Sequence, residues 1–396
     1  MATRVICPVK ESTFRLRGLK GIAPTAPNHI LLLPVFKPKF NPVLHFQYAA
    51  DTATLLAHAQ ASTGLSLILM AEKSAQINLQ TLSNAGIEFF GAIFPEVICD
   101  GRNHTSGAVL ATLPDDVEVY LVNNMHHFDP YGFAQQFNNV STVVAFVDAF
   151  SPNKVNFLEA MFQALAQGVK VIGGGAGKWS LLQEPVIFSH LGFHDNAALL
   201  LGIMTPIGLG LGHGWYICQG PFLVTESMHA TLQSLDYGSA PQLYKQIVEA
   251  HSGLSFSENE FFELAKSYPI GIVKHNGEMV VRDPISCDDN SIQMLGELPI
   301  YSVVNVLKGD SDTLLQATAQ MMRAAVADTN APYTHALIID CISRVGLLGS
   351  RFAEELELIT KGAGVPAAGA IALGEIASHG HKLFDFHNKT CVVGLL

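Results

Sequence analysis

The chain has 396 residues, 49% of them hydrophobic and 14% charged, and a formal net charge of -11. This composition supplies enough apolar side chains for more than one buried core and excludes a largely disordered chain. An acidic balance without a basic cluster argues against nucleic-acid binding, and no long unbroken apolar run predicts a membrane span. The six cysteines are scattered without a CxxC pair, and the N-terminal sequence has no apolar signal region, so we expect a cytoplasmic protein with reduced thiols.

Short apolar runs of strand type recur along the whole chain and predict mixed β-sheets covered by helices, an α/β (mixed α+β) fold. In chain order the predicted strands are Ile30–Phe36, Leu65–Met70, Val117–Val122, Thr142–Asp148, Val169–Ile172, Leu199–Ile203, Phe222–Thr225, Gly271–Lys274, Glu278–Arg282, Tyr301–Val306, Ala336–Asp340 and Thr390–Leu395.

Two helices are predicted from apolar side chains at helical spacing. The first covers Asn153–Gln167, with Ser151 as the expected N-terminal cap and Gly168 as its end. The second covers Thr313–Asp328, and Asp310, Ser311 or Asp312 is expected to cap it.

Two segments far apart in the chain have similar patterns. "GIEFFGAIFPEVI" (86–98) and "GVPAAGAIALGEI" (364–376) share a glycine, a β-branched residue and a Gly-Ala-Ile run, and an acid follows one position later in the second segment. We interpret this as an internal duplication that gives two related halves, with Glu96 and Glu375 in equivalent places and a boundary near Ser227–Gln233. Chance similarity between Gly/Ala-rich strands is the alternative.

Familiar enzyme and nucleotide motifs fail on inspection. "VIGGGAGKWS" lacks the first glycine and the Ser/Thr of a phosphate loop, and "GLGLGHGW" has His213 where a dinucleotide fingerprint needs glycine. Neither GxSxG nor HExxH occurs, so the sequence predicts a protein that is not an enzyme. Cys341, with Arg344 nearby, is the one nucleophile considered, and a core position for it is the alternative.

The segments "VKVIGGGAG" (169–177), "GHGWYICQGPFLVT" (212–225), "LDYGSAPQLYKQI" (235–247), "YPIGIV", "VVRDPI", "DCISR" (340–344) and the terminal "GAIALGEI…FHNKT" together resemble the FIST proteins. The resemblance implies an N-terminal arm at 1–30, a FIST N domain at 31–230 and a FIST C domain at 231–396. It also implies a sensory protein that binds a small ligand in signal transduction and acts in trans on a separate partner.

Among FIST proteins, the chain is most similar to the stand-alone branch of nitric-oxide-sensing hemoproteins. That similarity implies non-covalent heme b, with heme iron as the only metal, and regulation of a partner histidine kinase in a two-component system. No membrane or nucleic-acid partner is expected, and a homo-oligomer is left open. The alternative is a non-heme FIST sensor for an amino acid or another small metabolite.

Heme iron needs an axial ligand, usually an imidazole in an apolar pocket. "FSHLGFHDN" supplies His190 and His194 beside phenylalanines, and "NNMHHFDPYGF" supplies His126 and His127. For each residue, an ordinary surface histidine is the competing interpretation.

The remaining candidates are expected to line a small-ligand pocket. Glu375 stands in a Gly/Ala-rich apolar run, where burial requires a partner, and Arg344 is the candidate for that partner. Gly369 and Gly374 let a ligand or another backbone approach closely, and close strand packing is the alternative. The other pocket candidates are Cys341, Glu96, His213 and His387.

Overall fold

The computed structural model describes residues 45–396 apart from residues 63, 275–276, 330 and 381–384. These residues belong to one unit, Asn41–Leu396. The predicted N-terminal arm and the predicted strand Ile30–Phe36 lie outside the described residues. Among the described helices, none combines the length and the apolar character that crossing a membrane requires.

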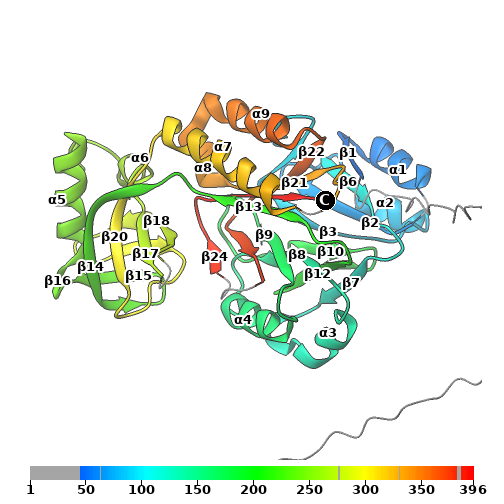
Figure 1. The fold of residues 1–396 in the computed structure, drawn as a ribbon, viewed down its shortest axis with the longest axis horizontal. Helices are drawn as coiled ribbons and strands as arrows, with labels where there is room; N and C mark the ends of the chain where they lie inside the picture. The colour runs from blue at the N-terminus through cyan, green and yellow to red at the C-terminus, as the bar shows by residue number, and fades with distance from the viewer. Residues whose placement is uncertain (1–44, 63, 275–276, 330, 381–384) are drawn as a thin grey trace, which may run out of the picture. The chain divides into compact units, whose positions relative to one another are not determined.

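Most of the chain consists of one unit repeated three times, in the order strand, helix, strand, helix, strand, hairpin, strand (Figure 1). Repeat I comprises β1 (His45–Ala49), α1 (Thr52–Ala61), β2 (Ser66–Ala71), α2 (Leu79–Asn84), β3 (Phe89–Phe94), the hairpin β4 (Glu96–Cys99) and β5 (Arg102–His104), and β6 (Ala108–Thr112). Repeat II comprises β7 (Glu118–Val122), α3 (Pro130–Gln136), β8 (Thr142–Asp148), α4 (Lys154–Ala164), β9 (Lys170–Ala176), the hairpin β10 (Ile187–Ser189) and β11 (Gly192–His194), and β12 (Ala198–Ile203). Repeat III comprises β13 (Gly208–Gly212), α7 (Ser311–Asp328), β21 (Ala336–Cys341), α8 (Ile342–Leu348) with α9 (Phe352–Ala363), β22 (Ala367–Ala372), the hairpin β23 (Glu375–Ser378) and β24 (Asp385–His387), and β25 (Cys391–Leu395).

Each repeat builds four strands of a sheet and gives its hairpin to another repeat. The hairpin β4–β5 extends the sheet of repeat III at β22, β10–β11 extends repeat I at β3, and β23–β24 extends repeat II at β9. The result is three six-stranded mixed sheets with the same strand order. Sheets that contain strands from both ends of the chain tie the repeats together.

A glycine at one repeated position makes the central parallel pairs possible. Gly91, Gly173 and Gly369 lie opposite Ile68, Ala145 and Ile338 on the neighbouring parallel strands. A Cβ at any of the three would overlap the carbonyl oxygen of that neighbour. Each is preceded, five residues earlier, by a glycine with positive φ, namely Gly86, Gly168 and Gly364. The two copies found in the sequence are therefore two of three, and the third is "GVKVIG" at 168–173.

The three sheets share one apolar core and carry helices on their outer faces. Val144, Ile339 and Leu69, one residue from each sheet, belong to the same buried cluster. On the outer faces, α3 and α4 pack on repeat II through Phe133 and Phe157, and α7 and α9 cover repeat III. In Figure 1 these helices lie on different sides of the strands.

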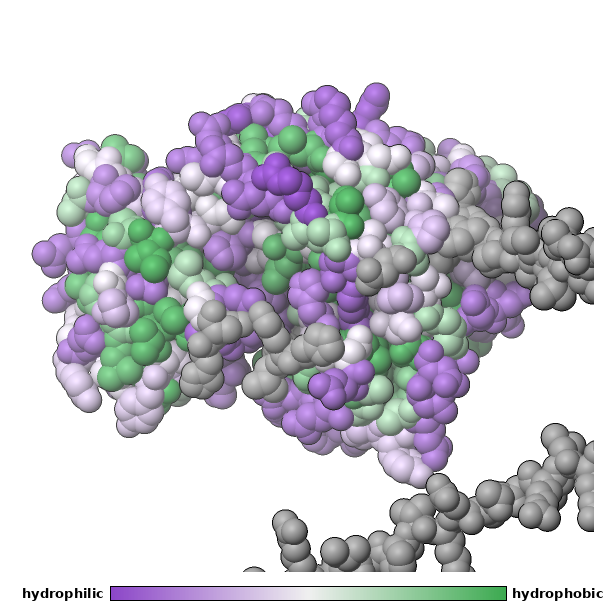
Figure 2. Space-filling model, viewed as in Figure 1, coloured by the Kyte–Doolittle hydropathy of each residue, from purple (hydrophilic) through white to green (hydrophobic). Residues whose placement is uncertain are grey.

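An antiparallel barrel is inserted into repeat III between β13 and α7. Its strands are β14 (Tyr216–Met228), β15 (Thr231–Leu235), β16 (Gly238–Ser239), β17 (Ile270–Val273), β18 (Met279–Cys287), β19 (Ile292–Leu295) and β20 (Val303–Lys308), with α5 (Ala240–Ser252) and α6 (Phe261–Ala265) between them. An additional pairing of β14 with β15 closes the sheet. Hydrophobic side chains are exposed on the barrel, including Ile300 and Val303 (Figure 2).

The predicted α/β fold with mixed sheets and covering helices is confirmed, and every predicted strand from Leu65 onward overlaps an observed strand. The first predicted helix is shorter than expected, since α4 ends at Ala164 and its N-cap is Asn153, which makes no side-chain cap hydrogen bond. Within this helix Val155 is exposed and Phe157 is buried. For α7, Asp310 is the cap and forms a capping box with Thr313.

Candidate functional site

The four histidines predicted as heme ligands lie in two separate places. His126 and His127 are exposed and belong to the 3-10 helix Met125–His127, whose Met125 is buried. His194 ends β11, and its Nε2 lies 2.9 Å from the Ser189 hydroxyl. His190 follows β10 and makes edge contacts with Phe89 and Phe90, and its buried Nδ1 has no hydrogen-bond partner among the described residues.

Glu375 and Cys341 meet in the interior, both fully buried. The Thr390 amide donates to Glu375 Oε2 at 3.1 Å, and the Lys389 amide donates to Cys341 Sγ at 3.1 Å. Burial raises the pKa of both side chains well above their ordinary values, so the glutamic acid and the thiol are held neutral. A neutral, enclosed thiol is a core group and a poor nucleophile.

Arg344 does not form the predicted ion pair with Glu375. Its guanidinium pairs instead with Asp340, at 3.2 Å, and with Glu355, and it donates to the His213 carbonyl oxygen at 2.7 Å. We call Asp340, Arg344 and Glu355 the Arg344 cluster. All three are completely buried, and the two carboxylates raise the pKa of Arg344 despite its desolvation. Asp340, Glu355 and Cys391 have the right atoms for a metal site, but Arg344 already pairs with both carboxyl groups, and burial raises the pKa of Asp340 well above its ordinary value.

Three other predicted pocket residues, Glu96, Gly369 and Gly374, contact neighbouring strands and side chains of the fold. Glu96 accepts a hydrogen bond from Asn103. It is not equivalent to Glu375, because the residue of its hairpin that has the same register position as Glu375 is Val97, one residue later. A shift of one residue along a strand points a side chain to the opposite face of the sheet. Gly369 serves strand packing, and a Cβ at Gly374 would overlap the ring of Phe386.

His213 and His387 are held in the neutral form. His213 Nδ1 accepts a hydrogen bond from the Trp215 amide at 2.9 Å. Burial, together with neighbouring cations, lowers the pKa of His213 to about 4 and that of His387 to about 3. Both imidazoles therefore remain uncharged at neutral pH.

A cleft of about 1130 Å³ lies where the barrel meets repeats II and III. One wall comes from the start of α4 and the loop before it, another from β17, β18 and the barrel loops, and a third from β24 and Asn388. Its apolar lining includes Phe150, Leu158, Ile272, Val303, Leu373 and Phe386. None of the four histidines predicted as heme ligands, all of them described, lines this cleft.

Two cations meet at Phe386 in the floor of the cleft. Lys154 Nζ lies 4.2 Å above the centre of the Phe386 ring, and Arg282 donates to the Phe386 carbonyl oxygen at 3.1 Å. Burial, helped by the proximity of Arg282, lowers the pKa of Lys154 to about 8. Burial also lowers the pKa of Arg282 to about 10. The nearby carboxylates therefore do not offset the loss of hydration of these two cations.

Asn388 adds an unsatisfied amide to the same wall. Phe386, in β24, and Asn388, in the bend that follows this strand, both line the cleft. Asn388 is 1% exposed, and neither its Oδ1 nor its Nδ2 has a hydrogen-bond partner among the described residues. A buried polar group without a partner is destabilising by about 1–3 kcal/mol. A ligand in the cleft would supply the missing partners.

Strained backbone gathers around the cleft. Leu181, His229 and Tyr301 line it and have φ values of +55°, +53° and +67°. Side chains other than glycine and asparagine rarely adopt this left-handed conformation, and such residues concentrate at ligand-binding sites.

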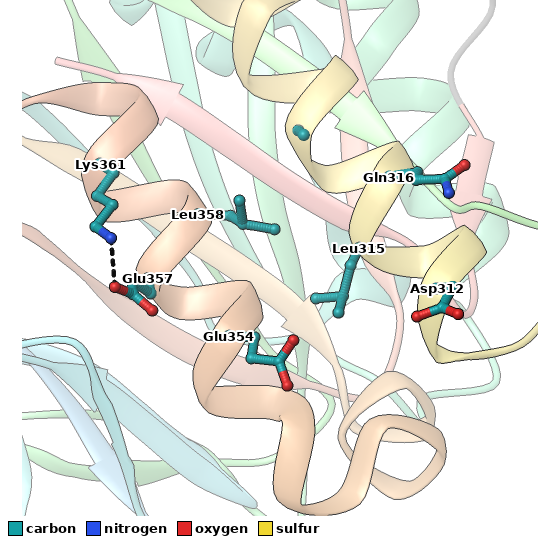
Figure 3. A pocket seen from close by; sticks show the side chains of 8 residues that line it. Asp312, Leu315, Gln316, Glu354, Glu357, Leu358 and Lys361 are labelled. Atoms are coloured by element: carbon teal, nitrogen blue, oxygen red, sulfur yellow. Dashed lines mark ion pairs between the residues drawn. The ribbon is translucent and has the colours of Figure 1, made fainter.

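A second hollow lies on the outer surface between α7 and α9 and has a volume of about 440 Å³ (Figure 3). Leu315 and Leu358 form its apolar part, and Asp312, Glu354 and Glu357 surround it with acidic groups. Lys361 pairs with Glu357 at 2.5 Å, as Figure 3 shows. The charged groups of this hollow are exposed to solvent. The cleft, where the buried amide of Asn388 has no partner among the described residues, is therefore the stronger candidate for a binding site.

Comparison with known families places the chain in the class of sensory proteins that bind small ligands in signal transduction. A FIST N domain matches residues 68–237 and a FIST C domain matches residues 240–378. The chain therefore belongs to the FIST family, as the sequence resemblance indicated. No curated protein matches the chain. Repeats I and II fall largely in the FIST N range, and the barrel and most of repeat III fall in the FIST C range.

The sequence analysis missed Lys154, Arg282 and Asn388. Arg282 and Asn388 lie in "VVRDPI" and "FHNKT", two of the segments that carry the family resemblance, and Lys154 lies in a predicted helix. The available signal was a polar residue inside a segment that resembles the family. That signal does not reveal that the side chains of Lys154, Arg282 and Asn388 meet.

Proposed function

We propose that this FIST protein senses a small metabolite, that the metabolite binds in the cleft, and that the protein works by binding rather than by catalysis. This proposal rests on the buried amide of Asn388 in the cleft wall, for which the described part of the chain supplies no hydrogen-bond partner. Ligand pockets are mostly apolar with a few convergent polar groups, and this cleft combines both with the left-handed residues at its edge. The metabolite contacts both the barrel and the repeats. Its binding therefore favours the conformation in which the barrel and the repeats can contact it at the same time.

The experiment is a thermal-shift screen of the full chain against a metabolite panel, with Val303→Arg as the matched variant. Val303 is 42% exposed and lines the cleft, so an arginine there occupies the cleft without disturbing the core. We expect at least one metabolite to raise the unfolding temperature of the original protein and to leave Val303→Arg unchanged. A hit that stabilises both proteins equally places its site elsewhere and contradicts the proposal.

The second candidate is heme-based nitric oxide sensing with regulation of a partner histidine kinase in trans. One observation favours it: His190 lies next to two phenylalanine rings, and its Nδ1 has no hydrogen-bond partner within the residues that the structure describes. The fit is otherwise poor, because His126 and His127 are exposed, His194 lies against Ser189, and none of the four lines the cleft. Bound heme would supply the iron that binds the gas, and His190 is the residue we assign to hold it.

An absorption spectrum separates the two candidates. Protein produced with added heme and then reduced is measured before and after nitric oxide, together with His190→Ala and His194→Ala. A Soret band that shifts with the gas and is lost in His190→Ala supports the hemoprotein. Colourless protein that stays colourless with added hemin eliminates it.

A further inference from the structure

The floor of the cleft brings together two cations, Lys154 and Arg282, and the amide of Asn388, which has no hydrogen-bond partner among the described residues. Lys154 comes from the first turn of α4, Arg282 from β18 of the barrel, and Asn388 from the segment between β24 and β25. Residues this far apart in sequence meet only because the barrel is inserted beside repeats II and III.

Phe386 and Gly296 fix the geometry of the three groups. The Phe386 ring carries Lys154 and its carbonyl oxygen binds Arg282, so the two cations sit on either side of one residue. A Cβ at Gly296 would lie 3.0 Å from Arg282 Nε and 3.3 Å from Asn388 Oδ1. Arg282 and Asn388 therefore border the same glycine, which leaves space between them.

We propose that this floor is an anion subsite, at which the carboxylate or phosphate of the sensed metabolite binds between Lys154, Arg282 and Asn388. The inference rests on the proposed function, since it names the chemical class of the ligand in the same cleft. The anionic oxygens accept from the ammonium, from the guanidinium and from Asn388 Nδ2. The rest of the ligand lies against the apolar lining, which includes Phe150 and Val303.

The charged groups around Lys154 bear on whether this subsite takes an anion or a neutral ligand. Its charged neighbours in the cleft are the carboxyl groups of Asp148, Glu159, Glu297 and Asp385 and the cations Arg282 and Lys274, and the imidazole of His229 also lines the cleft. Asp385 is already paired with Lys274 at 2.7 Å. Asp148 accepts hydrogen bonds from Gln183 and the Phe150 amide, and its pKa is raised by burial. Lys154 Nζ donates to the Ala149 carbonyl oxygen at 2.5 Å, and its pKa is lowered despite the nearby carboxylates. A bound anion supplies the ammonium with a further acceptor.

The test uses calorimetric titration of the full chain with three probes of similar shape: phenylacetate, phenyl phosphate and the uncharged phenylacetamide. We expect one of the two anions to bind and phenylacetamide to bind on the order of tenfold more weakly or not at all, because charge-assisted hydrogen bonds are lost. The stronger anion tells whether the subsite takes a carboxylate or a phosphate.

Variants locate the binding. Lys154→Met is expected to weaken the bound anion about tenfold, and Asn388→Leu to weaken it less, while Lys361→Met, on the outer surface of α9, leaves affinity unchanged. Affinity is also expected to fall as pH rises through about 8, where Lys154 loses its proton. In Lys154→Met this pH dependence disappears, which a merely structural role of the lysine does not explain.

The outcomes separate the subsite from the proposed function. Equal binding of phenylacetamide and the anions, unchanged affinity in Lys154→Met, or no binding of any probe overturns the subsite. The proposed function depends instead on the metabolite screen with Val303→Arg. A neutral metabolite that needs an open cleft upholds the function while overturning the subsite.

Discussion

Two positive sites in this protein, one fully buried and one half-buried, have pKa values shifted in opposite directions. Arg344 lies among Asp340 and Glu355, and its pKa is raised. Arg282 and Lys154 lie in the cleft, and their pKa values are lowered to about 10 and about 8. Desolvation lowers the pKa of each of the three cations, so the opposite directions of the shifts come from the carboxylates around them. The comparison separates a cation buried with its counter-charges from two cations whose desolvation the nearby carboxylates do not offset.

Breaking the Arg344 cluster is expected to have the largest effect. Arg344→Met leaves two buried carboxyl groups without their cation, so the free energy of unfolding should fall by about 3–5 kcal/mol. Urea denaturation followed by circular dichroism measures the loss. The double variant Arg344→Met with Glu355→Gln should recover part of it, and a single variant as stable as the original protein contradicts the structural role of the cluster.

Arg282→Met is expected to be less damaging to stability. It removes hydrogen bonds to the carbonyl oxygens of Glu297 and Phe386, so the free energy of unfolding should fall by about 1–3 kcal/mol. Ligand binding should be lost in a protein that remains folded. A loss of stability equal to that of Arg344→Met would remove the distinction between the two sites.

Lys154→Met sharpens the comparison through pH. The lysine pKa is about 8 in the folded protein and 10.5 as its ordinary value, so the unfolded chain holds the proton more tightly. The original protein should therefore gain stability as pH rises from about 8 toward 10.5, and the variant should lack this gain. At pH 7 the variant should be more stable by on the order of 1 kcal/mol. Thermal unfolding from pH 7 to pH 10 measures both curves, and parallel curves would show that Lys154 is well compensated.

The smallest effect is expected at an exposed ion pair. Lys361 Nζ lies 2.5 Å from Glu357 on the surface of α9, and both side chains are more than half exposed. Lys361→Met should change the free energy of unfolding by less than about 1 kcal/mol, because solvent screens such pairs. The same denaturation experiment applies, and a loss as large as that of Arg282→Met would show that exposure is a poor guide to the importance of a charge here.

The sequence predicted the elements of the fold better than the way they assemble. Buried strands such as Thr142–Asp148 are continuous apolar runs, and their boundaries follow from composition alone. The copy of the pattern in repeat II went unnoticed because its hairpin is separated from "GVKVIGGGAG" by a longer insertion than in repeats I and III. Glu375 was correctly singled out as a group that needs a partner, but the partners, Cys341 and the Thr390 amide, could not be identified without knowledge of which strands pair. The cleft floor was out of reach for the same reason, since Lys154, Arg282 and Asn388 are brought together by long-range pairing.

The exchange of hairpins among the three repeats has a consequence for synthesis on the ribosome. The hairpin β4–β5, made early, pairs with β22, which is made roughly 270 residues later. Until Ala367–Ala372 has left the ribosome, the edge formed by β4 has no partner strand, and such edges are prone to aggregation. Completing this sheet therefore joins segments that are separated by most of the chain, and the two FIST domains of the sequence complete their sheets only together.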